Sequence, residues 1–150
     1  MPLAPNVIRV AFDTVIFVRA LLNPRSRWGD LVFDRGLTYR LIVSAPVARE
    51  IVEVLGRSAL ARRFSTLPLR NAAAVLDVIA AAEQVPIDER AMPGVSRDPK
   101  DDVFLATAAT GGADFWVSED QDLLVLGTYA GVRIVDAQTF VAVLDAAAGA

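Results

Sequence analysis

The sequence predicts an α/β domain of three layers, in which a mostly parallel central sheet of about five strands is flanked by helices. Three observations predict this fold. The 150 residues suffice for one domain, 1–150, and are too few for two. Hydrophobic residues make up 54% of the chain and charged residues 22%, which is enough apolar material for a core. Short β-branched runs alternate with segments of helical periodicity, as in parallel strands joined by helices.

The first third of the chain predicts one strand and two helices. Val7–Phe12 is a short, apolar, β-branched run and is predicted as a buried strand. Thr14–Leu22 continues the apolar character and is predicted as a helix. Ser26 is expected to cap a second helix over Trp28–Arg35, which Gly36 would end as a C-cap.

The middle of the chain predicts a second strand followed by three helical segments. Tyr39–Val43 is the strand, and Pro46 fits the first turn of the helix Ala45–Gly56 because its missing N–H is not needed there. Further helices are expected around Ala59–Phe64 and over Pro68–Gln84, where apolar residues recur at helical spacing.

The last third predicts three more strands and two helices. Val85–Ile87 is a brief strand candidate, and Asp101–Thr110 reads as a helix with an apolar face. Phe115–Val117 and Val132–Val135 are predicted as strands, and Ala137–Ala147 as the final helix.

Composition limits the chemistry. The chain has no cysteine, which excludes disulfides, thiolate zinc sites and a cysteine nucleophile. It has no histidine, which excludes a Ser-His-Asp triad and the usual general base at neutral pH. Any reaction must therefore use carboxylates, hydroxyls, arginines, the single lysine (Lys100) or a hard metal ion. The net charge of −3 argues against binding nucleic acid over the whole surface.

The N-terminal residues and the hydropathy predict a soluble protein of the cytoplasm. Residues 1–6 lack a basic region followed by an apolar run, so no signal peptide is expected. No stretch reaches the roughly 18 apolar residues that a membrane span requires, so no membrane partner is expected.

Acidic residues fall where a parallel sheet places its functional site. Asp13 directly follows the first predicted strand, and Asp120 follows the strand Phe115–Val117. Asp101 and Asp102 open a helix, and Glu50 lies about one and a half turns into the helix after the second strand. Because ligands bind beyond the carboxyl ends of parallel strands, these carboxylates are expected to converge.

Converging carboxylates repel one another and require either protonation or a cation. Oxygen ligands suit Mg²⁺ or Mn²⁺, whose coordination is completed by water and phosphate oxygens. Such an ion can activate water for phosphodiester hydrolysis. Each acid also has a structural interpretation, since Asp101 and Asp102 could complement a helix dipole and Asp120 could be an N-cap. Asp13 is harder to explain structurally because it interrupts an apolar run.

Four segments of the chain resemble the motifs of the PIN-domain family, in the same order and over residues 7 to about 135. They are Val10–Thr14 with Ile16–Leu22, Ser44–Ile51 with its Glu50-Ile51 pair, Arg97–Leu105 running into Gly111–Asp114, and Ser118–Leu124.

The resemblance implies a PIN-like fold and an Mg²⁺- or Mn²⁺-dependent endoribonuclease, similar to VapC-type toxins of bacterial toxin–antitoxin pairs. RNA would be the substrate, a small antitoxin protein a partner, and a homodimer a possible assembly. The family's catalytic acids fall on Asp13, Glu50, Asp101 and Asp120, with the metal on Asp13, Asp101 and Asp120. Second-choice acids are Asp98, Asp102 and Asp122, and Thr14 and Ser118 would order the site. Possible RNA contacts are Arg25, Arg27 and Arg97.

One departure from the family pattern leaves alternatives open. The family usually has Asn after Asp-Thr, where this chain has Val15, which cannot order the site through hydrogen bonds. The first alternative is therefore a weakly active or inactive binding module of the same fold. The second is a phosphoryl-transfer protein with Asp13 as an aspartyl nucleophile, which the lack of a second acid at the first strand disfavours. Trp28 is expected in the core rather than as an exposed stacking residue.

Overall fold

The computed structural model describes residues 7–57, 69–88 and 99–149, and a six-stranded sheet lies at its centre. The strand order is β3-β2-β1-β4-β6-β5, with β5 antiparallel to β6 and every other pair parallel. The predicted α/β class and mostly parallel sheet are confirmed, with six strands where about five were expected. The strands are β1 (Ile8–Phe12), β2 (Tyr39–Val43), β3 (Glu83–Gln84), β4 (Phe115–Val117), β5 (Thr128–Tyr129) and β6 (Val132–Val135).

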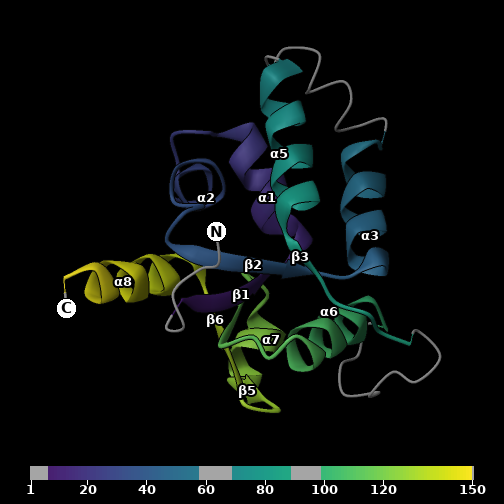
Figure 1. The fold of residues 1–150 in the computed structure, drawn as a ribbon, viewed down its shortest axis with the longest axis vertical. Helices are drawn as coiled ribbons and strands as arrows, with labels where there is room; N and C mark the ends of the chain where they lie inside the picture. The colour runs from purple at the N-terminus through teal and green to yellow at the C-terminus, as the bar shows by residue number, and fades with distance from the viewer. Residues whose placement is uncertain (1–6, 58–68, 89–98, 150) are drawn as a thin grey trace.

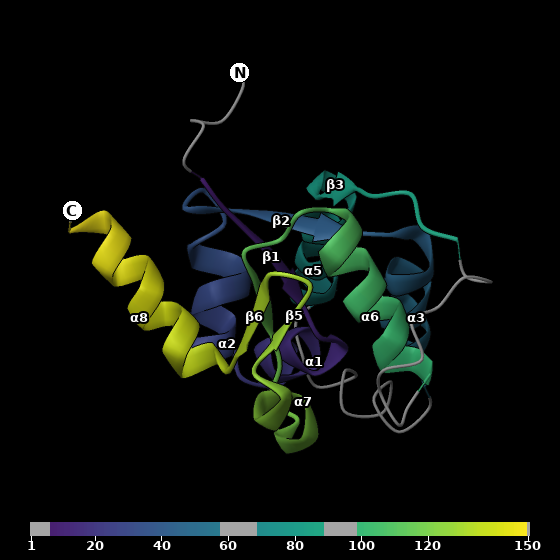
Figure 2. The ribbon, with the colours of Figure 1, turned by 90° about the horizontal axis from the view of Figure 1, so that it is seen from below.

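Helices cover both faces of the sheet (Figure 1). The helices α1, α2, α3 and α5 lie on one side of β1 and β2, and α6 lies on the other side. The helix α8 contacts α2, and Figure 2 shows the two side by side at one end of the molecule. The helices are α1 (Thr14–Leu22), α2 (Arg27–Gly29), the π-helical turn η1 (Asp30–Asp34), α3 (Ala45–Leu55), α5 (Leu69–Ala81), α6 (Pro99–Thr110), α7 (Gln121–Leu126) and α8 (Ala137–Ala148).

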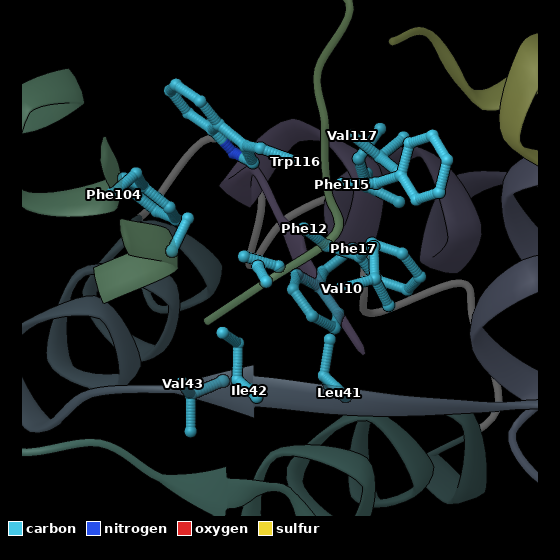
Figure 3. Close-up of a cluster of buried hydrophobic side chains, with 14 of the residues drawn as sticks. Val10, Phe12, Phe17, Leu41, Ile42, Val43, Phe104, Phe115, Trp116 and Val117 are labelled. Carbon is cyan, nitrogen blue, oxygen red and sulfur yellow. The ribbon is translucent and has the colours of Figure 1, made fainter. Parts of the chain in front are cut away.

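Alternation along the strands divides the core into two layers, because successive side chains of a strand point to opposite faces. On the α1 side, the ring of Phe12 lies 5.3 Å from that of Tyr39 and 6.1 Å from that of Phe140 in α8. On the α6 side, the Trp116 ring stacks on Phe104 at 5.9 Å with an interplanar angle of 7°. Figure 3 shows Phe104 and Trp116 lying apart from Phe115 and Val117.

The register of the parallel strands brings their carboxyl ends together. Phe12 is paired with Val117, and Val117 with Val135, so β1, β4 and β6 end side by side. The residues that follow these strands therefore share one edge of the sheet. This edge is where the acids were expected to meet.

The predicted strand Val85–Ile87 is wrong by two residues, because β3 covers Glu83–Gln84. Val85 still donates its N–H to the carbonyl of Val43 at 2.7 Å, but Pro86 follows and has no N–H to continue the ladder. The proline therefore ends the strand.

The predicted single helix Trp28–Arg35 is also corrected, since the chain forms the short helix α2 followed by the π-helical turn η1. Arg35 donates its N–H to the carbonyl of Asp30 at 3.0 Å, which is the i to i+5 spacing of a π-helix. The same wide turn places the Arg35 guanidinium on the Asp30 carboxylate at 2.7 Å. Ser26 caps α2 as predicted, whereas Arg35 and not Gly36 occupies the C-cap position.

The strand β5 was not predicted. It is two residues long and pairs with β6 through a tight turn at Ala130 and Gly131, which have φ values of 50° and 83°. Two successive positive φ values are those of a type I′ hairpin turn. Type I′ turns usually have Asn, Asp or Gly at the first of these positions and Gly at the second. Here only Gly131 fits that pattern, because alanine rarely adopts a positive φ.

The remaining predicted helices are confirmed to within a few residues. The helices α1, α3, α6 and α8 follow their predicted segments, and α5 covers Leu69–Ala81 of the predicted Pro68–Gln84. The helix expected around Ala59–Phe64 lies outside the described residues. Within the described ranges, no helix is both long and apolar enough to cross a bilayer.

Gly29→Ala is expected to destabilise the fold by about 3 kcal/mol, because a Cβ at this position would overlap the backbone carbonyl of Pro24. Gly36→Ala is the matched control, since a Cβ there meets nothing within 4 Å. It should change stability by less than about 0.5 kcal/mol. Urea denaturation followed by circular dichroism measures both; equal midpoints for the two variants would contradict the close approach at Gly29.

Candidate functional site

Asp13 anchors the site at the end of β1. It occupies the N-cap position of α1 with extended backbone, and its carboxylate makes no side-chain cap hydrogen bond. Its N–H donates to the carbonyl of Val117 at 2.9 Å, so its backbone is tied to the end of β4. Its carboxylate Oδ2 accepts a hydrogen bond of 2.9 Å from the hydroxyl of Ser118. The carboxylate therefore faces the sheet edge and is oriented by the neighbouring strand.

The charged form of Asp13 is disfavoured by its surroundings. Its pKa is raised from 3.8 to about 6, chiefly because burial disfavours the charged carboxylate. Hydrogen bonds from the Ser118 hydroxyl and the Thr14 backbone oppose the rise, whereas the negative charges of Asp120 and Glu50 add to it. Glu50 and Asp120 are thus near enough to act electrostatically on Asp13, whereas no such effect of Asp101 on the pKa of Asp13 is seen. The group resembles functional carboxylates, whose pKa values are commonly shifted by burial and like charge.

Ser118 links two of the acids. It is fully buried immediately after β4, where its own N–H donates to the carbonyl of Val135. Its hydroxyl donates to Asp13 and accepts the N–H of Asp120 at 3.1 Å. The predicted ordering role of Ser118 fits this geometry.

Asp120 has two roles at once. Its Oδ1 accepts the N–H of Asp122 at 2.9 Å, so it is the N-cap of α7, which is the structural interpretation considered from the sequence. Its negative charge also contributes to the raised pKa of Asp13. Asp122 is exposed in the first turn of α7 and gives α7 an acid at its N-terminus.

Glu50 reaches the site from α3. The cap of this helix is Ser44, whose hydroxyl accepts the N–H of Val47 at 3.4 Å. The hydroxyl of Thr14, itself buried at the start of α1, donates to Glu50 Oε2 at 2.6 Å. The predicted ordering residue Thr14 therefore ties the acid of α3 to the residue next to Asp13.

The two acids at the start of α6 differ in burial. Asp102 is buried, and Asp101 is half-buried, although both lie in the first turn of the helix. The helix is fixed to the end of β2 by a buried hydrogen bond of 2.7 Å between the hydroxyls of Ser44 and Thr107. Because Ser44 also caps α3, one residue positions both acid-bearing helices. The sequence-based prediction missed Thr107, whose only signal is a hydroxyl on the apolar face of a helix.

The other predicted residues are placed less centrally. Asp98 and Arg97 lie outside the described residues. Arg25 is exposed in the turn before α2, and Arg27 is exposed with its guanidinium 5.6 Å from the ring centre of Trp28. Trp28 is half-buried and packs against the core, as expected.

A preformed metal cage is not present among residues 7–57, 69–88 and 99–149, where no group of three or more acids stands close enough to hold a metal ion. The donor chemistry nevertheless suits a hard cation, since the converging side chains carry only oxygen. The half-buried carboxylate of Asp13, which the charges of Asp120 and Glu50 also act on, gives such a cation a favourable electrostatic position.

Comparison with known proteins identifies a family. A family model described as PIN domain matches residues 9–122, which is 114 of the 150 residues and runs from β1 to the start of α7. No curated protein matches the chain.

Asp13→Asn is expected to stabilise the protein at neutral pH. The folded-state pKa of about 6 lies above the ordinary value of 3.8, so the stability that protonated Asp13 supplies is complete below about pH 4 and is lost as the pH rises through 6. Asparagine keeps an acceptor for Ser118 without the charge. The free energy of unfolding of Asp13→Asn should exceed that of the parent protein by about 2 kcal/mol near pH 7.5, and this difference should vanish near pH 4.

Urea unfolding at the two pH values measures this difference. The control is Asp77→Asn, which removes an exposed carboxylate from α5. A stability difference between Asp13→Asn and the parent protein that does not change with pH would refute the electrostatic account.

Proposed function

The chain belongs to the PIN-domain family, whose members are typically nucleases, and from this premise we propose that it is a metal-dependent endoribonuclease. The observation that carries the proposal is the carboxylate of Asp13, half-buried at the carboxyl edge of the sheet within electrostatic reach of Glu50 and Asp120. A structural acid would be expected to pair with a cation or to lie in solvent. Asp13 instead meets a serine hydroxyl and two further acids.

Mg²⁺ or Mn²⁺ would be held by Asp13, Asp101 and Asp120, directly or through water. When bound, the ion supplies charge neutralisation of the scissile phosphate and a lowered pKa of the attacking water. A cation beside Asp13 would let this carboxylate stay ionised at neutral pH. The desolvation and the like charges that raise the pKa of the free carboxylate are the costs that a bound cation would relieve.

The surrounding residues orient the acids. The Ser118 hydroxyl donates to Oδ2 of Asp13. Because this hydrogen bond fixes the plane of the carboxylate, it also sets the direction of Oδ1. Thr14 holds one oxygen of Glu50 through its hydroxyl. We assign to Glu50 the orientation or deprotonation of the attacking water, because it enters from α3 rather than from the strand ends that carry Asp13 and Asp120.

The third acid is assigned within the first turn of α6. The family motif favours Asp101. The burial of Asp102 favours Asp102, the second-choice acid, in its place. The two acids are neighbours in the first turn of α6, so both residues belong in the test.

The biological role proposed is that of a toxin paired with a small antitoxin protein and acting on RNA in the cytoplasm, with a homodimer as the assembly. Support comes from the motif order, which is similar to VapC-type toxins. An adjacent reading frame encoding a small protein would add to it.

A binding module without turnover is the second candidate, and Val15 favours it. This side chain is half-buried in α1 and packs against the core, where the family's asparagine would contribute a polar group. The module and the enzyme differ in cleavage and not in fold.

Cleavage of a mixed RNA pool is expected in Mn²⁺ and not in EDTA, with Asp13→Asn lowering the rate at least about 100-fold because the metal loses a charged ligand. Asp77→Asn should cleave like the parent protein. Calorimetric titration with Mn²⁺ accompanies the assay. Metal binding without cleavage would favour the binding module, and neither binding nor cleavage would overturn the proposed function.

Asp101→Asn is expected to abolish Mn²⁺-dependent cleavage while the fold is retained. Asp102→Asn, made in parallel, tests the buried neighbour, and its thermal unfolding is compared with that of the parent protein. Unchanged cleavage by Asp101→Asn together with loss of cleavage in Asp102→Asn would assign the third metal-binding acid to Asp102 instead of Asp101. Full activity of both variants would remove α6 from the site.

A further inference from the structure

Two arginines lie on one tryptophan beside the acidic site. The guanidinium carbon of Arg19 in α1 is 4.8 Å from the ring centre of Trp28, and that of Arg27 is 5.6 Å from it. Both distances are those of a cation–π contact. The contacts hold two flexible side chains over one rigid, half-buried ring.

The tryptophan is itself fixed to the loop that carries Asp120. Its indole N–H donates to Glu119 Oε1 at 3.1 Å, and the same oxygen accepts the N–H of Ala137 at the start of α8 at 3.0 Å. Glu119 directly precedes Asp120 in the chain. The arginine pair therefore flanks the loop that contributes an acid to the site.

The positive charges of this pair are not used in ion pairs within the described part of the chain. Arg9, Arg35 and Arg40 all form salt bridges to carboxylates there, whereas Arg19 and Arg27 form none. The side-chain hydrogen bond of Arg27 goes to the neutral amide of Gln138 at 3.2 Å. The pKa of Asp136 is lowered mainly by hydrogen bonds from Thr139 and only slightly by the charge of Arg27.

We infer that Arg19 and Arg27, held on Trp28, form a phosphate-binding subsite for a single strand of RNA that enters the acidic site. The inference rests on the proposed function. The negative charges of Glu50 and Asp120 act on Asp13 and also repel phosphates, and the whole chain carries −3, so a local positive group is needed to retain the substrate.

The chemistry of the pair favours this ligand. A guanidinium binds phosphate oxygens in a bidentate manner, and stacking on an aromatic ring fixes its plane while leaving its N–H edge available. Because both guanidiniums lie over one indole, they can reach neighbouring phosphates of one flexible strand. Both guanidinium carbons lie within 5.6 Å of one ring centre, an arrangement that suits the phosphates of one flexible strand.

Binding in EDTA tests the subsite without cleavage. The probe is a fluorescein-labelled single-stranded RNA of about twelve nucleotides, followed by fluorescence anisotropy at several KCl concentrations. The double variant Arg19→Ala/Arg27→Ala should weaken binding at least about tenfold at low salt, and the slope of log K against log salt should become shallower by about 0.7 for each phosphate that the variant no longer neutralises. The matched control is Arg133→Ala, which removes an exposed arginine from β6 and should change neither quantity.

Equal affinities of the double variant and the Arg133→Ala control, both folded by circular dichroism, would overturn the subsite. So would equal affinity of the parent protein for a duplex of the same sequence, or displacement of the RNA by a polyglutamate chain at equal charge concentration. The latter would indicate an acidic protein segment as the ligand. Cleavage in Mn²⁺ is measured separately, so arginine-dependent binding without cleavage would end the nuclease assignment and leave the subsite in place.

Discussion

The hydrogen bond from Ser118 to Asp13 joins the ends of two neighbouring parallel strands, and the arrangement of the site depends on it. The pairing of β1 with β4 fixes the next residue of each strand at the same edge, where the backbone of Asp13 is also bonded to Val117. The carboxylate is consequently half-buried and held against the end of β4. Its raised pKa reflects the energetic cost of that position, and a cation is the ligand that would relieve it.

Neutral hydroxyl groups connect elements of the site. Ser118 orients Asp13, Thr14 binds Glu50, and Ser44 joins α3 to α6 through Thr107. A hydroxyl can fix a carboxylate or a helix without neutralising negative charge. The ion pairs of Arg9, Arg35 and Arg40 are made with Glu83, Asp30 and Asp145, so these three cations stabilise the fold away from Asp13. Arg19 and Arg27 stand at the margin of the site, on Trp28.

Predictions from the sequence were most accurate where burial is continuous. Buried parallel strands read as apolar runs, and β2, β4 and β6 have the predicted bounds. They failed where a local feature competes with the pattern. Pro86 ends β3 early, the π-helical turn η1 interrupts the predicted helix after Gly29, and the β5 hairpin uses an alanine at positive φ. Each case depends on backbone geometry that hydrophobic periodicity does not encode.

The sequence by itself determined the α/β class, the positions of β1, β2, β4 and β6 along the chain, the exclusion of histidine and cysteine chemistry, and the acids that could meet at one edge. These follow from composition and periodicity, which are local properties. Only the tertiary structure decided that Asp13 faces Ser118, that Glu50 is held by Thr14, that Asp102 is more buried than Asp101, and that two arginines share one indole. Those relations join residues distant in the chain, and strand register and helix packing set them.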